Sequence, residues 1–83
     1  MEEPFILTID YNGREYTFEA RLAAIGYTHK FYVVVNGKEV VYEPDEERKY
    51  RAILSGADQE KVTEQERGMI REIGIQIEEI RQN

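Results

Sequence analysis

The sequence at residues 5–22 is FILTIDYNGREYTFEARL. Its apolar residues recur at every second position on both sides of Asn12-Gly13, which is the period of a half-buried strand. Asn-Gly is typical of a two-residue hairpin, because a type I′ turn needs a positive φ at both central residues. Such a turn fixes three apolar pairs: Ile9 with Tyr16, Leu7 with Phe18, and Phe5 with Ala20. A slip by one residue would destroy all three pairs, so the stretch predicts a β-hairpin of defined register.

A second hairpin is predicted around Asn36-Gly37. The flanking segments, residues 30–35 and 38–43, are rich in β-branched and aromatic residues. The same type of turn sets four further pairs: Val33 with Val40 and Phe31 with Tyr42 on one face, Tyr32 with Val41 and Lys30 with Glu43 on the other. The first face is apolar and the second includes an opposite-charge pair, so both favour this register.

The segment after the second hairpin is less decisive. Residues 50–54 fit a short fifth strand and a single helical turn equally well, so the sequence leaves both open. The acidic run at residues 45–47 is typical of a solvent-exposed turn. Residues 55–58, SGAD, interrupt the pattern, and we expect them to form a loop that leads into the last element.

That last element is predicted to be an amphipathic helix over residues 64–81. Thr63 and Glu66 have the spacing of a capping box, in which each side chain accepts a hydrogen bond from the main-chain N–H of the other. An apolar stripe follows at helical spacing: Met69, Ile70, Ile73, Ile77 and Ile80. Gly68 and Gly74 each cost about 1 kcal/mol relative to alanine, so we expect the helix to depend on packing against the sheet.

Together these elements predict one α+β domain over residues 1–83. It consists of an antiparallel sheet of four, or five, strands with two Asn-Gly hairpins, and the C-terminal helix packs on one face of the sheet. The sheet is expected to contribute nine residues to the core: Phe5, Leu7, Ile9, Tyr16, Phe18, Phe31, Val33, Val40 and Tyr42.

Composition narrows the functional classes. The chain has no cysteine, which excludes disulfides, thiolate metal sites and cysteine nucleophiles. Its formal net charge of −6 opposes binding to phosphate backbones and anionic lipid, so we expect no nucleic-acid partner. No apolar run is long enough to cross a membrane, and residues 1–4 lack the basic start of a signal peptide. We therefore expect a cytoplasmic protein.

No residue is predicted to be catalytic, to hold a metal or to bind a cofactor. His29 and Ser55 are the single histidine and the single serine, and no glycine-rich phosphate loop or calcium-loop spacing is present. One alternative stays open. His29 lies at the predicted end of the sheet, where Tyr27 and Asp45 would complete a small binding or catalytic site around it.

The outer face of the second hairpin is the most informative surface. One helix covers one face of a sheet, so Tyr32, Val34 and Val41 are left pointing outward across two paired strands. Ile6 and Ile75 are further outward-facing apolar residues, each isolated. Either the chain's own Lys30 stem, the loop after Pro44 or the acidic turn covers the cluster, or the cluster is a surface for a protein partner or a homodimer. We expect the interaction surface, and hence a non-enzymatic protein-interaction or self-association module.

A resemblance adds a little to this interpretation. The segments GYTHKF at residues 26–31, VVYEPDEE at 40–47 and YRA at 50–52 resemble a group of short bacterial proteins of unknown function. The similarity spans the middle third of the chain and contains no mechanistic motif, so it implies a bacterial protein but no activity.

Overall fold

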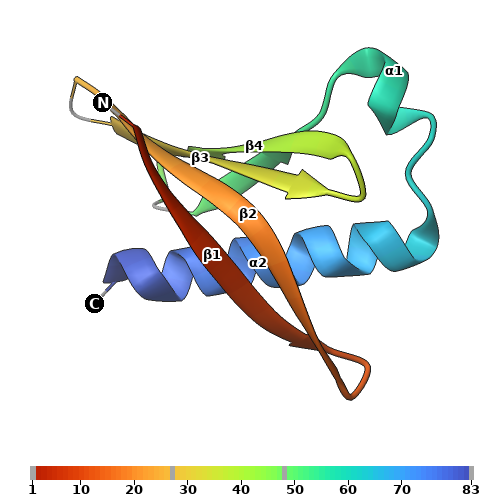
Figure 1. The fold of residues 1–83 in the computed structure, drawn as a ribbon. Helices are drawn as coiled ribbons and strands as arrows, with labels where there is room; N and C mark the ends of the chain where they lie inside the picture. The colour runs from red at the N-terminus through yellow and green to blue at the C-terminus, as the bar shows by residue number, and fades with distance from the viewer. Residues whose placement is uncertain (1, 27, 48, 83) are drawn as a thin grey trace.

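The fold is a five-stranded antiparallel sheet with one long helix on one face, as predicted (Figure 1). The computed structural model describes residues 2–26, 28–47 and 49–82. The elements are β1 (Glu2–Tyr11), β2 (Arg14–Ile25), β3 (Thr28–Val35), β4 (Lys38–Pro44), β5 (Tyr50–Ile53), α1 (Gly56–Gln59) and α2 (Glu64–Gln82). Strand order follows chain order, so each strand pairs with the one before it and no connection crosses the sheet.

Both hairpins turn where the sequence predicts. Asn12 and Gly13 have φ values of 52° and 77°, and Asn36 and Gly37 have values of 51° and 82°. Positive φ at both central residues is the geometry of a type I′ turn, whose twist matches that of the flanking strands. The predicted registers are confirmed in both hairpins, including Leu7 opposite Phe18 in the first and Val33 opposite Val40 in the second.

The fifth strand, which the sequence left open, is present. β5 pairs with β4, with Val41 opposite Ile53 and Tyr42 opposite Ala52. The turn between them is built by Asp45, whose Oδ1 accepts hydrogen bonds from the main-chain N–H groups of Glu47 and Lys49, both at 2.9 Å. The acidic run is therefore an ordered turn, in which one carboxylate holds the main chain in place.

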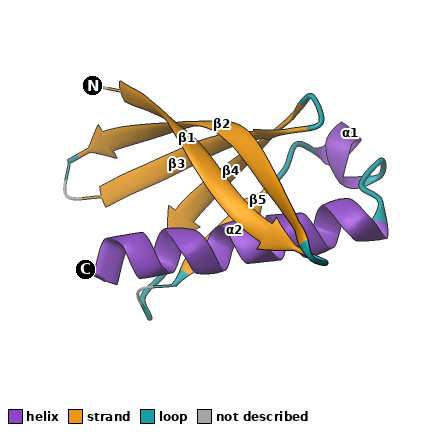
Figure 2. Ribbon diagram, turned by 60° about the horizontal axis from the view of Figure 1, so that its bottom comes forward, coloured by secondary structure: helices purple, strands orange, loops and turns teal. Residues whose placement is uncertain are grey.

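Helix α2 covers one face of the sheet, and Figure 2 shows it running beneath the strands and crossing them. The two layers enclose a core that includes Leu7, Phe31 and Val40 from the sheet and Ile73 and Ile77 from the helix. Ile80 was predicted to complete the stripe, and this was wrong: it is 45% exposed. Its angular position on the helix is suitable, but it lies in the last turn, where the sheet does not cover it.

Residues 55–58 were predicted as a loop, but the structure places one helical turn there. Ser55 is the N-cap of α1, and its hydroxyl accepts a hydrogen bond from the main-chain N–H of Asp58 at 3.4 Å. Serine is among the preferred N-cap residues, whereas Gly56 next to it masks the signal because glycine is a poor helix former. In the part of the chain described, neither helix combines the length and the apolar character needed to cross a membrane.

Candidate functional site

The outer face of the sheet, opposite α2, carries a row of side chains that runs across four strands. Register places Arg21 of β2 opposite Tyr32 of β3, Tyr32 opposite Val41 of β4, and Val41 opposite Ile53 of β5. Val34 lies two residues beyond Tyr32 on the same face of β3. We call Tyr32, Val34, Val41 and Ile53 the outer apolar patch. The fifth strand thus extends the predicted cluster by one isoleucine.

The outer apolar patch is accessible to solvent. Val34 is 39% exposed and Ile53 is 38% exposed, whereas Tyr32 and Val41 between them are half-buried. Apolar side chains that adjoin one another across neighbouring strands form a continuous surface, unlike single exposed residues, which are common on any protein.

Arg21 explains why Tyr32 is only half-exposed. The Cζ atom of its guanidinium group lies 5.0 Å from the centroid of the Tyr32 ring, a cation–π arrangement. Its Nη2 atom donates a hydrogen bond to Oε2 of Glu39 at 2.7 Å. Arg21 belongs to β2 and Glu39 to β4, so the pair crosses β3 between Tyr32 and Val34. An ion pair of the chain's own therefore lies across the patch, between Val34 and the other three residues.

Charged residues and a hollow border the patch. Nζ of Lys30 lies 2.9 Å from Oε2 of Glu43, which confirms the predicted cross-strand pair. On the β1 side, a hollow of about 430 Å³ is lined by residues that include Pro4, Ile6 and Arg21. Ile6 is 65% exposed at this margin, so its outward position is also confirmed. An apolar centre with a charged border is the usual composition of a protein–protein interface.

Ile75, the other isolated apolar residue singled out from the sequence, is 44% exposed on α2. The outer apolar patch lies on the strands, and α2 covers the opposite face of the sheet. Ile75 is therefore separate from the patch, and a single exposed isoleucine needs no functional explanation.

The alternative site around His29 is only partly visible. His29 lies half-buried on β3 opposite Ala24, and Tyr27 falls outside the described residues. The carboxylate of Asp45 already accepts two main-chain hydrogen bonds within its own turn. A carboxylate engaged in this way contributes to the fold whether or not it has another role. The histidine-centred site stays a hypothesis.

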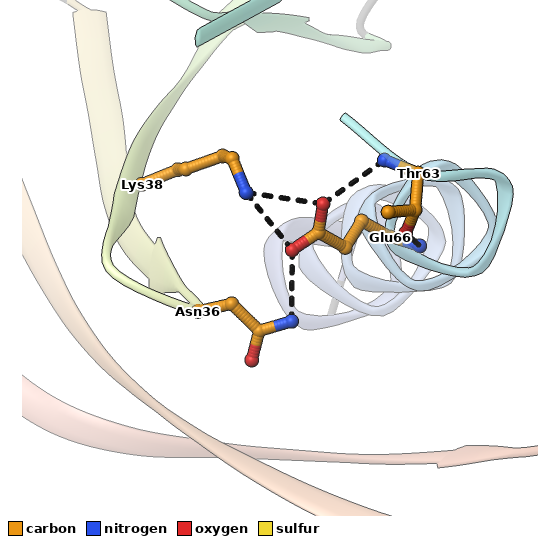
Figure 3. A network of polar contacts seen from close by, with 4 residues as sticks. All are labelled: Asn36, Lys38, Thr63 and Glu66. Atoms are coloured by element: carbon orange, nitrogen blue, oxygen red, sulfur yellow. Dashed lines mark hydrogen bonds and ion pairs between the residues drawn. The ribbon is translucent and has the colours of Figure 1, made fainter. Parts of the chain in front are cut away.

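A buried polar cluster joins the second hairpin to the start of α2 (Figure 3). Glu66 is only 5% exposed, and its carboxylate accepts hydrogen bonds from Asn36 Nδ2 at 2.8 Å and from Lys38 Nζ at 3.1 Å. It also accepts one from the main-chain N–H of Thr63 at 3.0 Å, while the Thr63 hydroxyl accepts from the main-chain N–H of Glu66 at 3.1 Å. The predicted capping box is thus confirmed and extended by two residues of the hairpin.

These contacts decide the protonation state of Glu66. The hydrogen bond from Thr63, followed by those from Asn36 and Lys38, lowers the pKa of the Glu66 carboxyl from 4.5 to about 2, against the opposing effect of burial. The carboxylate stays ionised near neutral pH with both oxygens occupied. A general base needs a pKa near the working pH and a free oxygen, so the cluster is suited to holding the fold.

Sequence reasoning explained Asn36 by the turn and Glu66 by the cap, and it missed that they meet. The available signal was Lys38, a cation at a position of β4 that shares the core-facing side of Val40 and Tyr42. A lysine that faces the core needs a buried anion, and Glu66 beside the apolar stripe was the nearest candidate.

No group of three or more metal-ligating side chains is gathered at one place among the described residues. Comparisons with protein-family models, curated proteins and solved structures found no match to this chain.

Proposed function

We propose that this protein is a non-enzymatic protein-interaction module that binds a protein partner through the outer apolar patch. The observation that carries the proposal is the continuity of Tyr32, Val41 and Ile53 across three neighbouring strands on the face that α2 leaves open, with Val34 exposed beyond the Arg21–Glu39 ion pair. Exposed apolar surface that is contiguous and bordered by charge is commonly an interaction site.

The residue types in the patch, and the fixed conformations of two side chains there, support this proposal. Tyrosine and arginine are enriched among the residues that dominate binding energy at interfaces. Arg21 is held over Tyr32 by its contact with the ring and by its ion pair with Glu39. Both side chains therefore lose little conformational entropy when a partner covers them, which favours binding.

Charge indicates the kind of partner. The outer face of the first hairpin presents the exposed acids Asp10, Glu15 and Glu19, and the chain as a whole has a formal charge of −6. The Lys30 and Arg21 charges are paired with glutamates. We therefore propose a partner that presents an aliphatic or aromatic contact surface bordered by lysine or arginine, because complementary charge speeds association and discriminates between partners.

The proposal is tested with peptides selected from a random-sequence library on the immobilised protein. Selected peptides should combine aromatic or aliphatic residues with lysine or arginine, and their chemical-shift changes should centre on Tyr32, Val34, Val41 and Ile53. Val41→Glu should weaken binding at least about 10-fold, because it places a charge in an apolar contact.

Thr17→Glu is the matched control, since Thr17 is exposed on the same face of β2 but away from the patch. It adds the same charge and should leave affinity within about 2-fold. Chemical-shift changes that centre on His29 would favour the alternative site. Equal losses of peptide affinity in Val41→Glu and Thr17→Glu would mean that only net charge matters. Either result would overturn the proposal.

A further inference from the structure

The two margins of the sheet differ in how their main-chain groups are satisfied. β5 has only four residues, and two of the chain's own side chains bond to main-chain groups at its two ends. The main-chain N–H of Tyr50 donates to Glu78 Oε2 at 3.1 Å, and the carbonyl of Leu54 accepts from Gln59 Nε2 at 3.3 Å. Short strands and covered edges are the usual protection against pairing with another chain.

β1 is ten residues long and forms the other margin of the sheet (Figure 1). A two-residue turn makes Tyr11 and Arg14 a hydrogen-bonded pair, so alternate residues of β1 bond to β2 and the others face away. The outward set is Pro4, Ile6, Thr8 and Asp10. Pro4 agrees with this assignment, because proline is tolerated on a strand where its missing N–H faces solvent. Among the described residues, no hydrogen bond to the main chain of Ile6 or Thr8 is found beyond the ladder.

We infer that β1 pairs antiparallel with β1 of a second copy of this chain, centred on Leu7, so that two five-stranded sheets become one. In this register Ile6 lies opposite Thr8 of the second copy, and Asp10 lies opposite its Pro4. Each Ile6–Thr8 pair exchanges two main-chain hydrogen bonds, and each Asp10 N–H donates one to the carbonyl of Pro4. Six unsatisfied donors thereby find acceptors, and Ile6, which is 65% exposed, gains cover.

The pattern of charge selects this register from its neighbours. Tyr11 is paired with Arg14, so the main chain at Glu3 of one copy lies two strand spacings, about 10 Å, from that at Arg14 of the other, a gap that the two long side chains shorten. A register centred on Thr8 instead sets Asp10 beside Ile6, whose neighbour on β2 is Glu19. A register centred on Ile6 loses the approach of Glu3 to Arg14, because Glu3 then lies opposite Ile9, whose neighbour on β2 is Tyr16. The register centred on Thr8 brings like charges together at two symmetric places, which is unfavourable.

This pairing uses the edge of β1, and the proposed function uses the outer face of β3, β4 and β5. Either can therefore fail without the other. The net charge of −6 on each copy opposes association at long range, so the pairing is best measured at about 150 mM salt, where the repulsion between whole copies is largely screened.

Engineered cysteines determine the register, because the chain has none of its own. The double variant Ile6→Cys, Thr8→Cys should form a disulfide-linked dimer under mild oxidation, since the two thiols of different copies lie directly opposite. Each single variant should remain unlinked, because identical positions are then diagonal neighbours about 7–8 Å apart, beyond the reach of a disulfide. Cross-linking by Ile6→Cys alone or by Thr8→Cys alone would overturn the assigned pairing.

Solution mass tests the pairing itself. The wild-type chain of 9.8 kDa should show a mass that rises toward twice this value as protein concentration is raised to about 1 mM. Thr8→Pro removes an outward N–H without touching the ladder to β2 and should lower the association constant at least about 10-fold. Thr8→Val keeps the N–H and should associate like wild type, as should Val41→Glu on the outer face. A wild-type mass that stays at 9.8 kDa throughout, or equal association of Thr8→Pro and Thr8→Val, would overturn the inference.

Discussion

The ring of Tyr11 lies against the main chain of α2 at Gly68, so that a β-carbon added to Gly68 would stand 2.6 Å from Cζ of Tyr11. Tyr11 is the last residue of β1, and Gly68 lies in the second turn of the helix. A glycine inside a helix normally costs about 1 kcal/mol relative to alanine. Here it permits a close approach between Tyr11, at the end of β1, and the helix, which compensates for its poor helix propensity.

Gly68→Ala is therefore expected to lower the free energy of unfolding by about 1–3 kcal/mol, because overpacking displaces Tyr11 and outweighs the gain in propensity. Urea unfolding followed by circular dichroism measures the change. In a Tyr11→Val background the same substitution should become neutral or stabilising, because valine is too short to reach Gly68. A stabilised Gly68→Ala single variant would show that Tyr11 moves aside without cost.

Gly74 supplies the matched control within the same helix. A β-carbon there would lie 3.5 Å from Cε2 of Tyr42, an ordinary van der Waals contact. Gly74→Ala should raise the free energy of unfolding by about 0.5–1 kcal/mol through helix propensity alone. Opposite signs for the two Gly→Ala variants, measured by the same urea titration, are the expected outcome. A gain in stability in both variants would mean that the contact between Gly68 and Tyr11 does not matter, and a loss in both would mean that the contact of Gly74 with Tyr42 is also too tight for a β-carbon.

Burial of the helix stripe predicts a second contrast. Ile73 is fully buried at 0% exposure, whereas Ile80 is 45% exposed. Ile73→Ala should lower the free energy of unfolding by about 2–5 kcal/mol through lost burial and a residual cavity. Ile80→Ala should cost less than about 1 kcal/mol, because much of the side chain that the substitution removes is already exposed to water. Similar losses in the two variants, measured by thermal and urea unfolding, would place the end of α2 against the sheet.

Local sequence patterns were sufficient to predict most of the fold. Each Asn-Gly turn can be predicted from its own two residues and from the alternation of apolar and polar residues in the flanking strands. The register that follows from the turns was confirmed for Leu7 and for Val33. The helix start at Thr63 was equally local. The sequence could not decide between strand and helix for residues 50–54, because five residues carry too little periodicity and the pairing that makes Ile53 part of a strand comes from β4.

The candidate site was harder to predict for a related reason. The outward parity of Tyr32, Val34 and Val41 followed from hairpin register. Arg21 reaches Glu39 only because β2 and β4 flank β3, and neighbours that are not consecutive cannot be read from one hairpin. The Glu66 cluster also joins residues 28 and 30 positions apart. Contacts of this range depend on the arrangement of whole elements, which sequence patterns constrain weakly.

The excess of acidic over basic residues predicts that the protein does not bind nucleic acid tightly. With a formal charge of −6, the protein should show no submicromolar affinity for random single-stranded DNA or RNA at about 150 mM salt, because few phosphate counterions would be released. Fluorescence anisotropy of a labelled oligonucleotide measures this affinity. Tight binding that weakens steeply with salt would locate a basic site that the overall charge conceals and would contradict this prediction.

The ionised Glu66 carboxylate predicts how stability depends on pH. Its pKa is about 2 in the folded state against an ordinary value of 4.5, so the folded state binds fewer protons. The stabilisation from this group is therefore fully present above about pH 5.5 and is lost as pH falls from there through about 2.

Glu66→Gln keeps a side chain that can complete a capping box but removes the charge that Lys38 faces, and should cost about 1–3 kcal/mol at pH 7. The difference from wild type, measured by urea unfolding from pH 7 to pH 3, should shrink as pH falls, because the Glu66 carboxyl of the unfolded state takes up a proton around pH 4.5 while that of the folded state stays ionised. Glu64→Gln, an exposed acid in the same first turn, is the control and should cost less than about 1 kcal/mol throughout. A Glu66→Gln penalty that stays constant with pH would show that side-chain shape, and not charge, holds the helix to the hairpin.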